Sequence, residues 1–182
     1  MATLTSEPPN DEFLPPNHPW RQRISRLLRE LVWTALLVGL VFMVVSSLGG
    51  RLQLPEMAPD FRAVNLDGQD IVLSHLRGKP VVLYFWASWC GACKLTSPTV
   101  KSFAENHPQV QVVAVSMEDP HAMRAEVGDI QHGMAFVSQN SQILEGYPVR
   151  ALPTTVVIDA QGKVLWSRQG VLLPGELNCR VP

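Results

Sequence analysis

Hydrophobic and polar positions divide the chain into a polar start, one long apolar run and a longer part built of short apolar runs. Residues 1–26 are polar and rich in proline, which predicts a disordered tail. Within residues 27–50, the stretch from Leu31 to Gly50 carries no charge. A helix of about 20 residues can cross the hydrocarbon core of a bilayer. The pattern therefore predicts one transmembrane anchor at residues 27–50.

The apolar run also fits two other kinds of segment, a cleaved signal peptide and a buried core helix. A signal peptide usually has a shorter apolar region and an Ala-x-Ala-like exit, whereas this run ends in SSLGGR. A core helix would show polar positions at helical spacing, and this run has almost none. Both comparisons favour an uncleaved anchor.

The charges on either side of the run predict its orientation. Arg51 directly follows the run, and four arginines precede it, namely Arg21, Arg23, Arg26 and Arg29. Because positive residues stay on the cytoplasmic side, we expect a cytoplasmic N-terminus and an exported domain. In a bacterium this would be a single-pass inner-membrane protein whose exported domain is periplasmic, in a compartment that permits disulfides.

The exported part begins with a linker that contains prolines, residues 51–59, and continues as a folded domain, residues 60–182. Apolar and polar residues alternate on either side of Asp67 and Gly68, which predicts a β-hairpin. Residues 154–168 contain two apolar stretches around a turn and predict a second hairpin.

A strand, a helix and a second strand follow one another in the middle of the domain. The continuous apolar runs 80–87 and 110–117 predict strands buried on both faces, and residues 90–106 predict a helix. A connection of this kind makes the two strands parallel. Residues 120–129 predict another short helix. The expected fold class is α/β, with a central mixed sheet and helices on both faces.

Two of the three cysteines stand in the motif Cys-Gly-Ala-Cys at the predicted start of the helix. There Cys90 faces free backbone N–H groups and the positive end of the helix dipole, which lower the pKa of a thiol. Cys93 follows nearly one turn later, and the small residues Gly91 and Ala92 keep the loop compact. Cys90 could attack a disulfide and Cys93 could resolve the product.

A permanent disulfide and a metal site are the alternatives to redox exchange. So small a loop constrains the unfolded chain little, which makes it a poor structural disulfide. Zinc requires four ligands, whereas Cu(I) accepts two thiolates. Three cysteines in 182 residues are too few for a disulfide scaffold. The formal net charge of −1 and the lack of basic clusters exclude a nucleic-acid surface.

The stretch FWASWCGACK resembles the thioredoxin active site, in which Trp-Cys-x-x-Cys-Lys follows an apolar strand. Pro98 stands where thioredoxins have a helix-kinking proline, and ALPTTVVID looks like the family's cis-proline loop. The stretch from Ala58 to Cys90 is similar to the membrane-anchored TlpA and DsbE types, most closely to the ScsD type of copper-sensitivity suppressor. The resemblance covers about residues 58–170 and implies a thioredoxin-like fold for residues 60–182.

The resemblance also implies a role for the residues of the motif. Cys90 would be the nucleophile and Cys93 the resolving thiol of a redox-active disulfide. Trp89 would form an apolar shelf beside them, although plain core packing is an alternative.

The loop Leu152-Pro153-Thr154 is the second part of the implied site. Pro153 would be cis, and it would set the backbone of Leu152 against the disulfide, where it can pair with a substrate strand. Thr154 would open the next strand.

Two positions depart from the family pattern. Tyr84 stands where thioredoxin has a buried aspartate, and Thr96 stands where reducing members of the anchored subgroup often have a glutamate. Deprotonation of Cys93 must then use water, Tyr84 or another group. Glu118 and Asp119 are candidates, although such a pair is more often just a polar loop.

Two further segments differ from a plain thioredoxin. Residues 117–149 would be the insert that the anchored subgroup adds between sheet strands. After residue 170 the chain offers only a shortened closing helix, and Cys179 lies there, most simply as an incidental free thiol at a frayed end.

The predicted function is thiol:disulfide exchange on exported cysteine-containing proteins, in an undecided direction. It needs no cofactor, no metal and no nucleic acid, and a membrane electron donor or acceptor would reset the disulfide. The ScsD resemblance adds copper tolerance. A metal-binding or cytochrome-assembly adaptor is the alternative. A peroxiredoxin-like peroxidase is disfavoured because Leu83 and Ala87 stand where peroxiredoxins have proline and a hydroxyl residue.

Overall fold

The computed structural model describes residues 19–47, 52–127 and 133–182. The chain divides into two compact units, Met1–Val45 and Ser46–Pro182. The predicted tail up to residue 18, the end of the predicted anchor and the end of the helix predicted at 120–129 lie outside the described residues.

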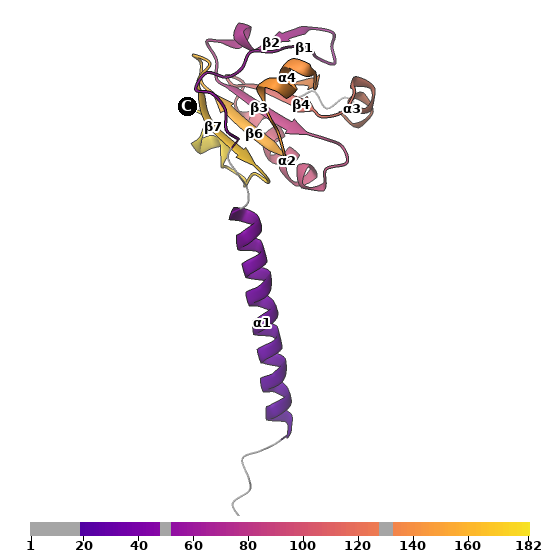
Figure 1. Ribbon diagram of the computed structural model, residues 1–182, viewed down its shortest axis with the longest axis vertical. Helices are drawn as coiled ribbons and strands as arrows, with labels where there is room; N and C mark the ends of the chain where they lie inside the picture. Colours follow the sequence, from indigo (N-terminus) through magenta and orange to yellow (C-terminus); the bar gives the residue numbers. More distant parts are fainter. Residues whose placement is uncertain (1–18, 48–51, 128–132) are drawn as a thin grey trace, which may run out of the picture. The chain divides into compact units, whose positions relative to one another are not determined.

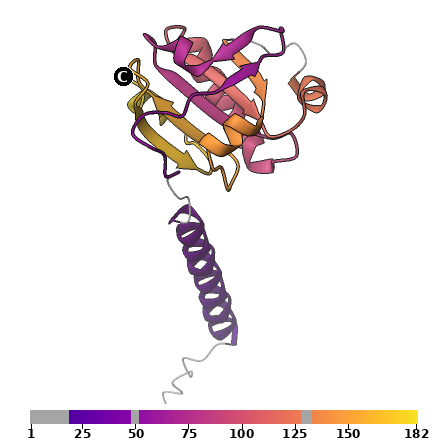
Figure 2. The same cartoon turned by 45° about the horizontal axis from the view of Figure 1, so that its top comes forward.

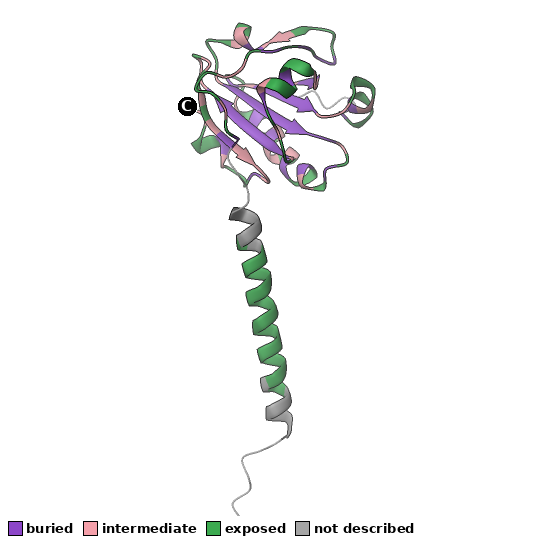
Figure 3. Cartoon of the chain, in the orientation of Figure 1, coloured by how far each residue is buried: buried purple, intermediate pink, exposed green. Residues whose placement is uncertain are grey.

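Helix α1 (Pro19–Ser47) begins within residues 1–26, for which the sequence predicts a disordered tail, and continues through the expected anchor to Ser47. It begins at a proline, a residue favoured at the first helical position because its missing N–H needs no partner there. Apolar side chains such as Leu31, Trp33 and Leu37 are exposed along it (Figure 3). Among the described residues, no helix combines the length and the apolar character that crossing a membrane requires.

The second unit is built on a five-stranded sheet with the strand order β5-β4-β3-β6-β7 (Figure 1). Its strands are β3 (Val81–Trp86), β4 (Gln111–Ser116), β5 (Met134–Ser138), β6 (Thr154–Ile158) and β7 (Val164–Gln169). β3, β4 and β5 are parallel, whereas β6 and β7 are antiparallel to their neighbours. All six residues of β3 are buried, as its continuous apolar run predicts. The expected mixed sheet is confirmed.

Helices cover both faces of this sheet (Figures 1 and 2). Helix α2 (Gly91–Asn106) joins β3 to β4, which confirms the predicted parallel strand-helix-strand unit, and α3 (Pro120–Val127) follows β4. Buried side chains of both helices join the core on one face. The 3-10 helix η1 (Leu73–Leu76) and α4 (Ser141–Gly146) pack against the core on the other face.

Alternation along β3 explains how one strand supports both cores, because successive side chains point to opposite faces. Val82, Tyr84 and Trp86 belong to the core beneath α2. Their neighbours Val81, Leu83 and Phe85 belong to the core beneath α4. Tyr84, in the middle of the strand, is thereby placed under the first turns of α2.

Both predicted hairpins are present. β1 (Arg62–Val64) pairs with β2 (Asp70–Val72) in antiparallel register across a turn longer than two residues. Asn65 holds that turn, because its Oδ1 accepts from the backbone N–H groups of Asp67 and Gln69. Gly68 sits in it at φ 80°, a conformation that glycine adopts readily. The hairpin of β6 and β7 is the second one.

Two features of the insert and the C-terminal segment shape the rest of the domain. Within residues 117–149, β5 extends the sheet beyond β4, and α4 covers its other face; the sequence pattern predicted neither element. After β7, the described chain forms only the short 3-10 helix η2 (Leu177–Cys179), which agrees with the prediction of a shortened closing helix. Leu177 is buried and anchors this segment to the core beneath α2.

Candidate functional site

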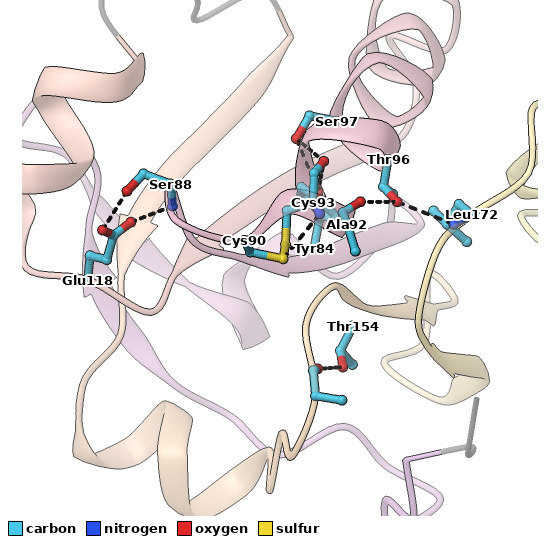
Figure 4. Close-up of a disulfide and its surroundings, with 11 residues drawn as sticks. Tyr84, Ser88, Cys90, Ala92, Cys93, Thr96, Ser97, Glu118, Thr154 and Leu172 are labelled. Atoms are coloured by element: carbon cyan, nitrogen blue, oxygen red, sulfur yellow. Dashed lines mark hydrogen bonds between the residues drawn. A yellow bond between two sulfur atoms is a disulfide. The ribbon is translucent and has the colours of Figure 1, made fainter. Parts of the chain in front are cut away.

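The two cysteines form a disulfide at the start of α2 (Figure 4). Cys90 is the N-cap residue with extended backbone angles, and its Sγ accepts the backbone N–H of Cys93 at 3.1 Å. The Cα atoms of the two residues are 5.2 Å apart. The structure thus places Cys90 at the helix start that the sequence predicted.

The surroundings of the two sulfur atoms differ. Both cysteines are buried, but Cys90 is 7% exposed and Cys93 only 1%. A thiolate at Cys90 would lie at the positive end of α2, with a backbone N–H already directed at its sulfur. Gly91, the first residue of the helix, is exposed next to Cys90. These features suit Cys90 to attack and Cys93 to act second.

Two hydroxyl groups meet the backbone carbonyl of Cys93. Ser97 Oγ donates to it at 2.9 Å, Tyr84 Oη donates at 3.2 Å, and the two hydroxyl oxygens are 3.1 Å apart. Pro98 follows directly and has no N–H to donate within the helix. Ser97 was not predicted as a site residue, although its spacing of four residues from Cys93 places it one helical turn away.

Tyr84 is a hydrogen-bond donor in this site. Burial raises the pKa of Tyr84 to about 12, and the hydrogen bond with Ser97 acts in the opposite direction. The phenol is therefore protonated at neutral pH. Of the groups considered as acceptors for the Cys93 proton, Tyr84 is unsuited to that role.

Thr96 connects α2 to the segment after β7. Its side chain is buried, its Oγ1 donates to Ala92 O at 3.2 Å, and it accepts the N–H of Leu172 at 3.4 Å. Figure 4 shows this link on the side of the disulfide away from Ser88. Thr96, at the position where reducing members of the anchored subgroup often have a glutamate, therefore makes a structural contact with Leu172.

The proline loop has the expected geometry. The peptide bond between Leu152 and Pro153 is cis, which confirms the prediction. Leu152 packs against the core cluster that contains both cysteines. Thr154 is buried at the start of β6, and its Oγ1 donates to Ala151 O at 2.6 Å. Gly170 N–H, from the end of β7, donates to Pro153 O at 2.7 Å and fixes the loop.

Trp89 does not pack in the core. The residue is 72% exposed, although it directly precedes the buried Cys90. Core packing, one of the two interpretations of Trp89, is therefore wrong. An exposed indole next to the disulfide is a surface on which apolar side chains of another molecule can lie.

The two acidic residues after β4 accept hydrogen bonds from different segments. Glu118 accepts the backbone N–H and the Oγ–H of Ser88, each at 2.7 Å. Asp119 accepts the N–H groups of His121 and Ala122 at the start of α3, and these bonds lower the pKa of its carboxyl group although burial opposes them. Cys179, the remaining cysteine, is an exposed free thiol.

A cavity of about 490 Å³ adjoins the buried cysteine. Cys93, Tyr84 and Ser97 line one side of it, and the side chains of Val127 and Phe136 line another. Its size exceeds that of a water molecule many times. Water in this cavity would lie beside Cys93.

A disulfide at a helix start, opposite a cis-proline loop on a mixed sheet, defines the class of thioredoxin-like thiol:disulfide oxidoreductases. The chain belongs to the AhpC/TSA family, whose model matches residues 54–167. It is 28% identical to the thiol-disulfide oxidoreductase ResA of Oceanobacillus iheyensis, over 89% of this chain and 92% of that protein. It is 31% identical to ResA of Bacillus thuringiensis, over 63% of this chain and 69% of that protein.

A solved structure extends the comparison to three dimensions. The thiol:disulfide interchange protein DsbE from Chlorobium tepidum matches with a TM-score of 0.60 and 30% identity, over 66% of this chain and 88% of that chain. The names of the ResA relatives and of this structure describe one activity, thiol:disulfide exchange. The chain is a thiol:disulfide oxidoreductase of the ResA and DsbE type.

Proposed function

We propose that Cys90 and Cys93 exchange a disulfide with exported cysteine-containing proteins, with Cys90 as the nucleophile. The observation that supports this most is the position of Cys90 as the N-cap of α2, disulfide-bonded to Cys93, in the core cluster against which Leu152 of the cis-proline loop packs. Trp89 and the backbone of Leu152 offer the surfaces on which a substrate segment would lie.

The proposed exchange proceeds in two displacements. In the reducing direction, the Cys90 thiolate attacks one sulfur of a substrate disulfide, and the other substrate sulfur leaves as a thiolate. The Cys93 thiolate then attacks Cys90 Sγ, which breaks the mixed disulfide and releases the second substrate thiolate. The substrate gains two electrons and the enzyme loses two. The same steps in reverse oxidise a substrate dithiol.

Water is the proposed acceptor for the proton of Cys93. The cavity beside Cys93 has room for it, whereas Tyr84 is protonated and Glu118 is bound to Ser88. A membrane electron donor or acceptor would return the pair to its starting redox state. The resemblance to the ScsD type and a role in copper tolerance stay predictions.

A peroxidase function is less well supported, although the sequence before β3 shares a motif with peroxiredoxins. A peroxide-reducing site needs a hydroxyl group to hold the peroxide near the attacking sulfur. At the two diagnostic positions the chain has Leu83 and Ala87, both buried and apolar. Thiol:disulfide exchange requires no such hydroxyl group.

The test of the proposed site is turnover of a disulfide-containing protein such as insulin. We expect Cys90→Ser to abolish turnover and Cys93→Ala to accumulate mixed disulfides that identify the substrates. Cys179→Ser, which removes the exposed thiol, is the matched control and should retain full turnover. Turnover by Cys90→Ser at the rate of the unmodified chain would exclude the mechanism and favour an adaptor that only holds its ligand.

A further inference from the structure

The loop that leads into Cys90 is held by a carboxylate from the next strand. Ser88 donates its backbone N–H to Glu118 Oε2 and its hydroxyl to Glu118 Oε1, each at 2.7 Å (Figure 4). The two residues are 30 positions apart in the sequence, and both are half-buried. Hydrogen bonds to a carboxylate are about twice as strong as neutral ones. Glu118 therefore fixes the backbone two residues before Cys90.

Glu118 is itself held in place by the end of β4. Its backbone N–H donates to Ser116 Oγ at 3.2 Å, and Ser116 is fully buried. The N–H of Met117 donates to Trp86 O at 2.9 Å, which joins the ends of β3 and β4. The carboxylate is thus presented to the loop by two paired strands of the central sheet.

The position of this carboxylate also has an electrostatic consequence. A negative charge near a thiol disfavours the thiolate, whereas a positive charge favours it. Other charged groups on the surrounding elements are Lys94 and Lys101 on α2 and Glu126 on α3, which line the adjoining cavity, and Asp119, which caps α3. Among these charged groups, Glu118 is the one bonded to the loop that carries Cys90.

We propose that Glu118 is a positioning residue that holds the Cys90 loop and, through its negative charge, makes the disulfide harder to reduce. A charge that destabilises the Cys90 thiolate destabilises the reduced enzyme relative to the disulfide. The chain would accordingly be a stronger reductant with Glu118 than without it. This inference rests on the proposed role of Cys90 and Cys93 in exchange.

Two variants separate the charge of Glu118 from its hydrogen bonds. In Glu118→Gln the amide oxygen can still accept the Ser88 N–H, and the amide NH₂ can donate to Ser88 Oγ, so that only the charge is lost. In Ser88→Ala the charge and the backbone hydrogen bond remain, and only the hydroxyl contact is lost. Glu145→Gln removes an exposed carboxylate from α4, on the opposite face of the sheet, and is the matched charge control.

The measurement is the equilibrium constant of the Cys90–Cys93 disulfide with glutathione at pH 7, together with the pH dependence of Cys90 alkylation. For Glu118→Gln we expect the equilibrium to move toward the dithiol by about threefold to tenfold, since a single nearby charge acts on this scale. The pH midpoint of alkylation should fall. Ser88→Ala should move the equilibrium by less than Glu118→Gln, and Glu145→Gln should leave it unchanged.

The outcomes distinguish failure of the proposed charge effect of Glu118 from failure of the proposed exchange function. An equilibrium constant of Glu118→Gln equal to that of the unmodified chain would overturn the charge effect, as would an equal shift in Glu145→Gln. A larger shift in Ser88→Ala than in Glu118→Gln would also overturn it, because loop geometry alone would then explain the data. If the unmodified chain fails to equilibrate with glutathione at all, the proposed exchange function fails first.

Discussion

Tyr84 shows how one side chain changes the chemistry around the disulfide. Its hydroxyl lies among buried groups, where it donates to the carbonyl of Cys93 and contacts Ser97. A carboxylate at this position would accept protons, whereas a phenol with a pKa of about 12 keeps its own proton at neutral pH. The residue therefore fixes the first turn of α2 and leaves the proton of Cys93 to another acceptor.

Tyr84→Phe should have two effects on stability. At neutral pH the lost hydrogen bond should lower the free energy of unfolding by about 1 kcal/mol. Between pH 10 and about pH 12 the unfolded chain loses the phenol proton and the folded chain keeps it, so the unmodified protein loses stability as pH rises. Tyr84→Phe should show a smaller loss across that range in urea unfolding experiments.

Tyr147→Phe is the control for this alkaline effect. Burial also raises the pKa of Tyr147, whose hydroxyl donates to Pro59 O on the far side of the sheet. Tyr147→Phe should reduce the alkaline loss of stability in the same way, because the buried phenol of Tyr147 also keeps its proton in the folded chain. Identical pH profiles for Tyr84→Phe and the unmodified chain would contradict the expected role of Tyr84.

Helix α4 is a short element that depends on its cap. Asn140 Oδ1 accepts the N–H of Ile143 at 3.0 Å and caps the helix, while Asn140 Nδ2 donates to Arg62 O at 2.7 Å and joins it to β1. Six residues are too few for an independent helix. The cap and the burial of Ile143 therefore keep α4 on the sheet.

Asn140→Ala should lower the free energy of unfolding by about 1 kcal/mol or more, because it removes both the cap and the link to β1. Asn140→Ser keeps a capping oxygen and loses the donor to Arg62 O. It should be less destabilising than Asn140→Ala when both are unfolded in urea. Equal losses for the two variants would mean that the cap contributes nothing.

At the scale of the whole molecule, we propose that the apolar run of residues 27–50 anchors the oxidoreductase domain to the inner membrane. The uncharged stretch from Leu31 to Gly50 and the four arginines before it support this proposal. ResA relatives share the domain that would be exported. Tethering would keep the disulfide close to a membrane electron donor or acceptor.

This proposal predicts that the intact chain sediments with bacterial membranes and resists alkaline carbonate extraction. Protease added to spheroplasts should digest the oxidoreductase domain. A chain that begins at Arg51 and is exported by a cleavable signal should stay in the aqueous periplasmic fraction. Recovery of the full-length chain in the aqueous fraction, or of a mature form that lacks the apolar run, would refute the anchor.

Local patterns in the sequence predicted most of the strands and helices of the second unit, Ser46–Pro182. The continuous apolar runs gave β3 and β4, the turn residues gave both hairpins, and the cysteine motif marked the start of α2. These elements depend mainly on neighbouring residues. β5 and α4 escaped prediction because both are short, and β5 is defined by its pairing with β4 rather than by its own pattern.

The sequence by itself predicted the cysteine pair and the elements that carry it, because these follow from residues close together in the chain, and its resemblance to thioredoxins predicted the cis-proline loop. Only the tertiary structure decided the contacts around them. Ser88 meets Glu118 across 30 residues, and Thr96 meets Leu172 across 76. Such contacts depend on how strands and helices pack, as does the exposure of Trp89, an apolar residue that hydrophobicity alone would bury.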